Sequence, residues 1–155
     1  MFFGREMLGK IEEPIHRVLV VEDEPLIAFD NENFLGHAGY DVVGTVDGYE
    51  AAIALIESEK IDLVIADVRL SGEKDGVAVA AFASARGIPV LFVTGACPID
   101  AQSLAVGCLA KPYSQRTLLA SIKVVNAVTR GQRVPRLPVG LSLFGIDRDE
   151  EDPQS

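Results

Sequence analysis

The sequence predicts an α/β fold: a doubly wound sheet of five parallel strands with helices on both faces. Short apolar runs rich in β-branched residues alternate five times with segments of helical spacing, the pattern of parallel strands joined by crossover helices. The runs are apolar almost throughout, as expected for strands that are covered on both faces rather than on one.

Length and composition limit the classes of function. The chain has 155 residues, enough for one domain with modest extensions, and 48% of them are hydrophobic. The formal net charge of −9 argues against nonspecific nucleic-acid binding, because such binding needs a basic surface. No apolar run approaches the roughly 18 residues of a membrane span, and the first residues lack the apolar stretch of a signal peptide. We therefore expect a cytoplasmic protein in which both cysteines, Cys97 and Cys108, are reduced.

The elements can be placed in chain order. Strands are expected over residues 17–21, 40–46, 61–66, 88–93 and 107–110. Helices are expected over residues 25–38, 49–59, 76–85, a short piece of 98–104, and 114–128. Pro25 suits the first turn of a helix, Gly39 and Gly87 stop helices, and Ser114 caps the last one. In the first helix, Leu26 and Phe29 belong to an apolar series at roughly helical spacing.

The two ends of the chain depart from this pattern. Residues 1–15 show no clear periodicity and are expected to be an N-terminal extension, which leaves the domain over 16–129. The tail over 130–155 is interrupted by prolines and becomes acidic, so we expect it to be extended or disordered. Its apolar stretch over 141–146 is suited to docking on the domain or on a partner.

Polar residues follow the predicted strands. In chain order they are Glu22 and Asp23, Asp67, Thr94 and Lys111. The carboxyl ends of parallel strands meet at one edge of the sheet, where open α/β sheets bind ligands. Carboxylates gathered there repel one another and need a cation, and oxygen ligands suit Mg²⁺. A hydroxyl and an ammonium suit phosphoryl oxygens, so Asp67 is placed for attack on phosphorus. Taken alone, Asp67 is equally well explained as a turn residue.

Five short motifs occur in order at these strand ends. They are Glu22-Asp23-Glu24-Pro25, Asp67, Asp75-Gly76, Thr94-Gly95 and Lys111-Pro112-Tyr113. Together they resemble the receiver domain of bacterial two-component response regulators over about residues 16–129. The resemblance implies a flavodoxin-like (βα)5 fold with a short fourth helix.

The resemblance also implies roles for single residues. Asp67 matches the phosphoacceptor, and Thr94 and Lys111 match the hydroxyl and amine that contact the phosphoryl group. The Mg²⁺ positions are matched by Glu22, Asp23, Asp67 and the backbone carbonyl of Arg69. Glu24 is interpreted as a solvated charge at the start of a helix. The implied donor is a histidine kinase or histidine phosphotransfer protein, with a downstream protein as a further partner and neither nucleic acid nor a membrane span.

Three features depart from typical receivers. Cys108 stands where most receivers carry a tyrosine or phenylalanine, three positions before the lysine, whose ring turns inward together with the switch hydroxyl. Only residues 95–110 separate Thr94 from Lys111, which leaves room for little helix. The segment 91–97 resembles the Phe-Ala-Thr-Gly motif of an atypical alphaproteobacterial receiver subfamily that includes single-domain regulators.

We therefore expect a stand-alone receiver that signals through protein contacts or serves as a phosphorelay intermediate or sink, and not an enzyme acting on other substrates. The alternative is a receiver-like module that binds a partner without phosphorylation. A carboxylate-nucleophile phosphatase is disfavoured because Arg69 stands where such enzymes usually carry a second aspartate. A nucleotide-binding domain is disfavoured because residues 22–24 are acidic rather than glycine-rich.

Overall fold

The structure is a computed structural model that describes residues 14–70 and 72–145. Its strands are β2 (Arg17–Val21), β3 (Asp41–Val46), β4 (Leu63–Asp67), β5 (Val90–Thr94), β6 (Gly107–Ala110) and β7 (Leu141–Leu143). Its helices are α1 (Pro25–His37), α2 (Tyr49–Ser58), α3 (Gly76–Ala85) and α4 (Gln115–Thr129), with a short 3₁₀ helix, η1 (Gln102–Leu104). The expected fourth helix is thus reduced to a single 3₁₀ turn.

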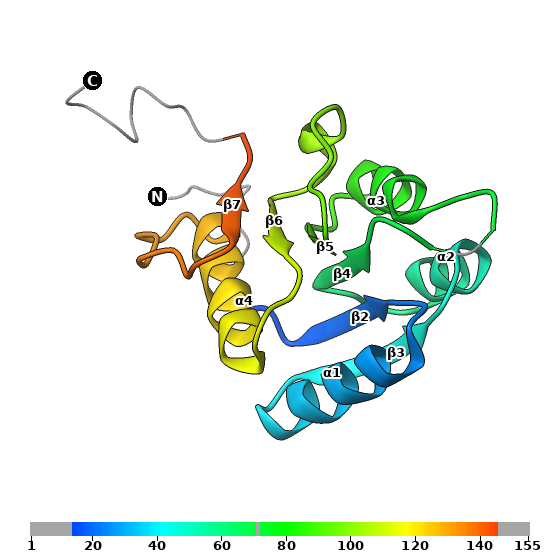
Figure 1. Ribbon diagram of the computed structural model, residues 1–155, viewed down its shortest axis with the longest axis horizontal. Coiled ribbons are helices and arrows are strands. Elements are labelled where there is room, and N and C mark those ends of the chain that lie inside the picture. Colours follow the sequence, from blue (N-terminus) through cyan, green and yellow to red (C-terminus); the bar gives the residue numbers. More distant parts are fainter. Residues whose placement is uncertain (1–13, 71, 146–155) are drawn as a thin grey trace.

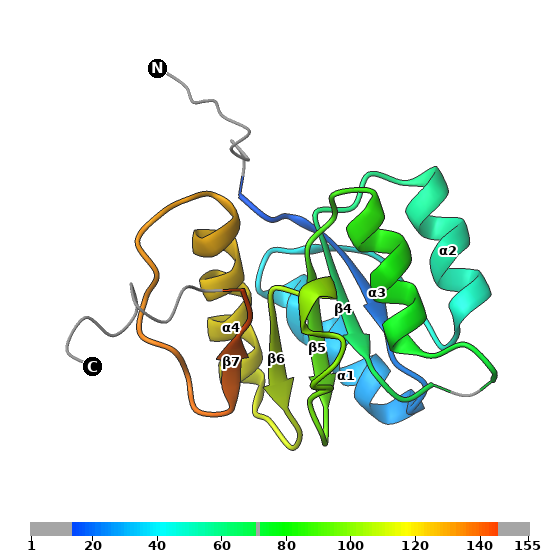
Figure 2. The same cartoon turned by 90° about the horizontal axis from the view of Figure 1, so that it is seen from above.

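The strands form one sheet in the order β3-β2-β4-β5-β6-β7. Strands β2 to β6 pair in parallel, and β7 pairs antiparallel with β6. From β2 the chain adds β3 on one side and then β4, β5 and β6 on the other, as the labelled strands of Figure 1 show, and Figure 2 gives a second view of β4 to β7. The carboxyl ends of β2 and β4 therefore flank the topological switch point, where ligands bind in open α/β sheets.

Helices cover both faces of the sheet, as Figure 1 shows. Side chains of β2 alternate between two cores: Val18 and Val20 pack with residues of α1 and α4, whereas Leu19 and Val21 pack with residues of α2 and α3. All residues of β4 and β5 are buried. This double coverage explains why the strand sequences are almost continuously apolar.

Local signals set the helix ends; Ser114, Gly39 and Gly87 act as the sequence predicts, and Asp75 is a further cap. The Asp75 carboxylate accepts hydrogen bonds from the backbone N–H groups of Val77 and Ala78 at the start of α3. Ser114 accepts one from the Thr117 N–H at the start of α4. Gly39 and Gly87 follow α1 and α3 with φ of 100° and 78°, a conformation that favours glycine.

Helix α1 buries a face that the sequence did not define. Asn31 and Leu35 are its buried residues, whereas Leu26 is 80% exposed and Phe29 is 65% exposed. The helix carries apolar side chains around much of its circumference, so its sequence alone does not define which side meets the sheet. The consequence is an apolar surface on the outside of α1.

A sixth strand, β7, extends the sheet beyond the five predicted. The apolar segment 141–146 was expected to dock on the domain or on a partner, and Leu141–Leu143 docks on β6. Gly107 of β6 permits the approach, because a Cβ there would lie 2.5 Å from the backbone oxygen of Ser142. Leu141 is buried in the same core as α4.

The expectation of two reduced thiols is wrong for this structure, in which Cys97 and Cys108 form a disulfide. The loop after β5 folds back so that the two Cα atoms lie 6.1 Å apart, within the range that a disulfide spans. The sequence interval between the cysteines did not indicate this contact.

The expected N-terminal extension lies largely outside the described residues, as does the end of the tail, and the proposed divisions at residues 15 and 130 stay predictions. Within residues 14–70 and 72–145, no helix is long and apolar enough to cross a membrane.

Candidate functional site

The carboxyl ends of the central strands collect buried polar side chains. Asp67 ends β4 and is 5% exposed, and Glu22 directly follows β2 and is 2% exposed. Thr94 ends β5 and is also buried. The structure thus brings these predicted residues to one edge of the sheet. Burial of carboxylates is unfavourable unless they are paired, so a partner is required here.

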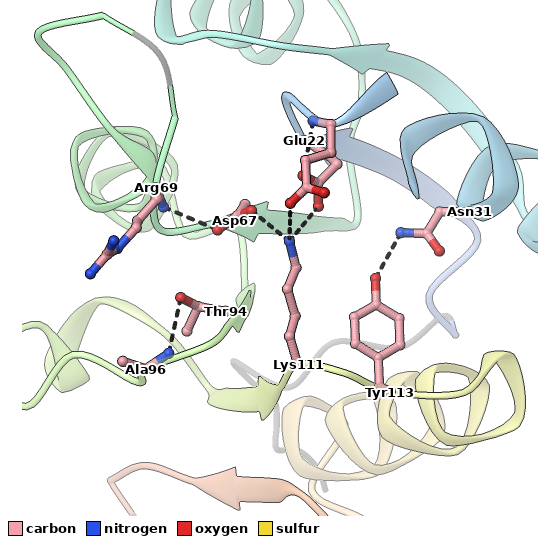
Figure 3. A network of polar contacts seen from close by, with 9 residues as sticks. Glu22, Asn31, Asp67, Arg69, Thr94, Ala96, Lys111 and Tyr113 are labelled. Carbon is pink, nitrogen blue, oxygen red and sulfur yellow. Dashed lines mark hydrogen bonds and ion pairs between the residues drawn. The ribbon is translucent and has the colours of Figure 1, made fainter. Parts of the chain in front are cut away.

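Lys111 is that partner (Figure 3). Its Nζ donates to Asp67 Oδ2 at 2.7 Å and to Glu22 Oε1 at 3.1 Å. The Glu24 carboxylate lies 3.7 Å from the same nitrogen. The backbone carries Lys111 to this point because its N–H bonds the Thr94 carbonyl at 2.8 Å, directly after β6. The predicted amine therefore contacts the predicted acceptor.

The electrostatics of this cluster follow from burial and pairing. Burial raises the pKa of Glu22 above 4.5, although hydrogen bonds from the Glu24 N–H and Lys111 act in the opposite direction. Burial alone would lower the pKa of Lys111, but its hydrogen bonds to Asp67 and Glu22 outweigh that effect and raise the pKa above 10.5. Lys111 is therefore firmly a cation at neutral pH.

The acidic group fits a divalent cation chemically. Carboxylate oxygens of Glu22, Glu24 and Asp67 lie within 4.8 Å of one another, and such hard donors suit Mg²⁺. Glu24, interpreted from sequence as a solvated charge, is exposed yet belongs to this group. Asp23 lies outside the group but lines the adjoining cavity. The assignments of Asp23 and of the Arg69 carbonyl to the metal stay predictions.

An open cavity of about 530 Å³ lies over the buried carboxylates. Its wall includes Asp23, Glu24, Asp67, Arg69, Leu70, Thr94, Gly95, Ala96 and Lys111. The Arg69 N–H donates to Asp67 Oδ1 at 3.0 Å, which fixes the second oxygen of that carboxylate. The Arg69 side chain points away from Lys111 in Figure 3. Thr94 Oγ1 accepts a long hydrogen bond from the Ala96 N–H at 3.4 Å.

The start of α3 packs against the backbone of Asp67. Gly76, the first residue of α3, packs so closely on the Asp67 backbone that a Cβ would overlap the Asp67 carbonyl. Its N–H bonds the Val68 carbonyl at 2.9 Å. The Asp75-Gly76 motif thus holds the backbone that presents the acceptor carboxylate.

One contact beside the site was not predicted from the sequence. The buried Asn31 of α1 donates from Nδ2 to the Tyr113 hydroxyl at 2.9 Å. Burial raises the pKa of Tyr113, with the Asn31 hydrogen bond acting in the opposite direction. A polar residue on the same side of α1 as Leu35 was the available signal, but its partner lies far along the chain.

Comparisons with known proteins agree with this geometry. The family model for the response regulator receiver domain matches residues 18–123. The chain is similar to the transcriptional regulatory protein PdtaR of Mycobacterium tuberculosis, with 35% identity over 127 residues, covering 78% of this chain and 60% of PdtaR. It is also similar to the phyllosphere-induced regulator PhyR of Methylorubrum extorquens, with 33% identity over 93 residues, covering 59% of this chain and 34% of PhyR.

Solved structures resemble this fold over about three quarters of the chain. The signal receiver domain of a modulated diguanylate cyclase from Desulfovibrio desulfuricans matches with a TM-score of 0.65 and 31% identity, over 76% of this chain and 97% of that domain. The chain spans 60% or less of the length of PdtaR and PhyR.

Proposed function

The chain belongs to the family of response regulator receiver domains, and on that premise we propose that it accepts a phosphoryl group on Asp67. One observation carries the proposal: the Asp67 carboxylate is buried at the end of β4, receives a 2.7 Å hydrogen bond from Lys111, and borders an open acidic cavity. A buried carboxylate beside a lysine and a hydroxyl is equipped for aspartyl-phosphate chemistry.

The chemistry uses groups that the chain itself supplies. A carboxylate oxygen of Asp67 attacks the phosphorus of a phosphohistidine, the phosphorus–nitrogen bond breaks, and the imidazole leaves and takes up a proton. Lys111 and Thr94 then hold phosphoryl oxygens through hydrogen bonds, of which the one from the cationic amine is the stronger.

We assign Mg²⁺ to Glu22, Asp23, Asp67 and the Arg69 carbonyl, with Glu24 as a further candidate ligand. When bound, Mg²⁺ neutralises charge on the phosphoryl oxygens. Asp23 lines the cavity directly, and Glu24 lies in the group of close carboxylates, so each is supported by a different observation.

The donor docks on α1 in this proposal. A second cavity of about 430 Å³, mostly apolar, lies between α1 and the segment after β6 and shares Lys111 with the acidic cavity. The exposed Leu26 and Phe29 extend the apolar surface of α1. These features support a protein donor, a histidine kinase or histidine phosphotransfer protein, which delivers its phosphohistidine beside Asp67 in the cytoplasm.

We further propose that the chain belongs to the atypical alphaproteobacterial subfamily with the Phe-Ala-Thr-Gly motif. Three observations support this placement: the sequence of segment 91–97, the cysteine at position 108 in place of an aromatic residue, and the similarity to PhyR. In this proposal the chain acts as a stand-alone receiver, signalling through protein contacts or passing on its phosphoryl group, rather than as an enzyme with another substrate.

The test is phosphorylation with acetyl phosphate and Mg²⁺, followed by mass spectrometry of the peptides. The added phosphoryl group is expected on Asp67 of the wild type, with none on Asp67→Asn and much less when Mg²⁺ is chelated. Asp62→Asn is the matched control, because it removes a carboxylate that bonds backbone N–H groups at the other end of the sheet. Phosphate on another residue, or none, would favour the phosphorylation-independent binding module.

A further inference from the structure

A covalent bond joins the two sequence segments that carry the switch residues. Cys97 lies in the loop after Thr94, and Cys108 lies in β6, shortly before Lys111. Their disulfide closes a loop across a sequence separation of 11 residues. Cys108 is fully buried, between Phe92 of β5 and Ser142 of β7, whereas Cys97 is half-buried.

The loop closed by this bond has little other structure near Thr94. Its regular structure is confined to η1, and Ile99 is strongly exposed. At its near end, the Ala96 N–H makes only a 3.4 Å hydrogen bond to the Thr94 hydroxyl. A stronger backbone bond, from the Val106 N–H to Val90 at 2.8 Å, occurs at the far end. The disulfide is therefore the firm attachment closest to Thr94 along the loop.

We propose that Cys97 and Cys108 form a reversible redox site that controls how readily Asp67 accepts a phosphoryl group. The control of phosphorylation rests on the function proposed above, whereas the redox site itself does not. Cytosolic disulfides are usually transient and redox-sensing, so a disulfide in a cytoplasmic receiver fits a regulatory bond better than a permanent one.

The redox chemistry needs a dithiol reductant of the thioredoxin class and a peroxide oxidant. In reduction, a reductant thiolate attacks the sulfur of Cys97, the less buried of the two cysteines, and Cys108 leaves as a thiolate that takes up a proton. The second reductant thiolate then releases Cys97, so two electrons and two protons enter the protein. In oxidation, the Cys97 thiolate attacks hydrogen peroxide and forms a sulfenic acid, with hydroxide as the leaving group. The Cys108 thiolate then attacks the Cys97 sulfur and displaces a second hydroxide to give the disulfide. Each cycle of oxidation releases two molecules of water.

The disulfide opposes the movement that phosphorylation requires. In this proposal the Thr94 hydroxyl turns toward Asp67 to donate to a phosphoryl oxygen, and the loop residues after Thr94 shift with it, because the Ala96 N–H is hydrogen-bonded to that hydroxyl. The bond to Cys108 on the rigid, buried β6 restrains Cys97 and hence that movement. Reduction removes the restraint, so the reduced protein accepts phosphate more readily.

The experiment compares the full chain after treatment with a dithiol or with hydrogen peroxide, each then removed. Alkylation and intact-mass measurement should find two free thiols in the reduced protein and none in the oxidised protein. With acetyl phosphate and Mg²⁺, the reduced protein should become phosphorylated faster than the oxidised protein, on the order of fivefold, which corresponds to about 1 kcal/mol of activation free energy. Cys97→Ala is the matched variant: it should react at the fast rate after either treatment, and unchanged folding is verified by circular dichroism.

Each result is decisive. Two free thiols after peroxide treatment would overturn the redox site. Equal phosphorylation rates in the two redox states, or a Cys97→Ala variant that still responds to peroxide, would overturn the control of Asp67. If neither redox state accepts phosphate, the proposed phosphoacceptor function fails together with the coupling, while the thiol counts still decide the redox site.

Discussion

The Glu22 carboxylate is in an unfavourable position for two reasons: it is almost completely buried, and it lies beside the Asp67 carboxylate. Lys111 compensates both acids at once, which keeps the cluster tolerable in the folded chain. Such an arrangement favours cation and phosphoryl binding at the expense of folding stability, a common compromise at functional sites.

The pH dependence of stability tests the burial of Glu22. Because burial raises the pKa of Glu22 above 4.5, its carboxyl group stays protonated to a higher pH in the folded chain than in the unfolded chain. Protonation of Glu22 therefore adds to the free energy of unfolding below pH 4.5, and this contribution is lost as the pH rises through the pKa of the folded state. Glu22→Gln lacks this titration, so its stability relative to wild type should improve as pH rises through that window.

Urea unfolding at a series of pH values measures this difference. The exposed Glu32→Gln of α1 is the control for the loss of one negative charge. A Glu22→Gln variant that loses stability relative to wild type as pH rises would contradict the prediction.

At the level of elements, the sequence predicted the parallel strands and their crossover helices well. The bounds of β2, β6 and α3 agree with the expected ranges, because each is a strong local pattern closed by glycine, proline or a cap. Helix α1 was placed correctly, but the sequence did not define its buried face, and apolar residues such as Leu26 and Phe29 face outward. Burial of that helix is decided by contacts with the sheet and by the Asn31–Tyr113 hydrogen bond, which local periodicity does not contain.

The junction between β4 and α3 gives a prediction at this level. Gly76→Ala places a methyl group against the Asp67 carbonyl, a backbone atom that cannot turn aside. We expect a loss of roughly 1–3 kcal/mol or more of unfolding free energy and a marked loss of Asp67 phosphorylation. Gly36→Ala in α1 is the control: its Cβ meets nothing within 4 Å, so it should stabilise the chain by about 0.5–1 kcal/mol. Equal stabilities of the two variants in urea would refute this account of Gly76.

At the scale of the whole molecule, the strand-end logic predicted which side of the sheet carries the site. Asp67, Glu22, Thr94 and Lys111 were identified because each directly follows a recognisable strand. Three features were not predicted: the position of Glu24 among the close carboxylates, the disulfide, and the pairing of β7 with β6 as a sixth strand. Each depends on a distance between segments that are remote in sequence.

The docking of β7 can be tested through Gly107. Gly107→Ala introduces a Cβ 2.5 Å from the Ser142 backbone oxygen and should force β7 away from β6. Exposure of the Leu141 side chain, which is buried in the wild type, should lower the free energy of unfolding by roughly 1.5–3 kcal/mol. Urea unfolding measures this change. In a chain ended after residue 139, the same substitution should have little effect, because β7 is already missing. An equal cost in both chains would show that Gly107 matters for another reason.

Strand β7 also determines what one edge of the sheet, the edge beside β6, offers to another copy of the chain. Without it, the buried strand β6 would present a free row of backbone N–H and C=O groups, a template on which another chain could add a strand. With it, the outer strand has only three residues and lies between Gly140 and Gly145, whose φ values of 92° and 73° interrupt extended backbone. So short an edge gives an incoming strand little to pair with. The tail thereby protects this side of the protein against aggregation at high concentration.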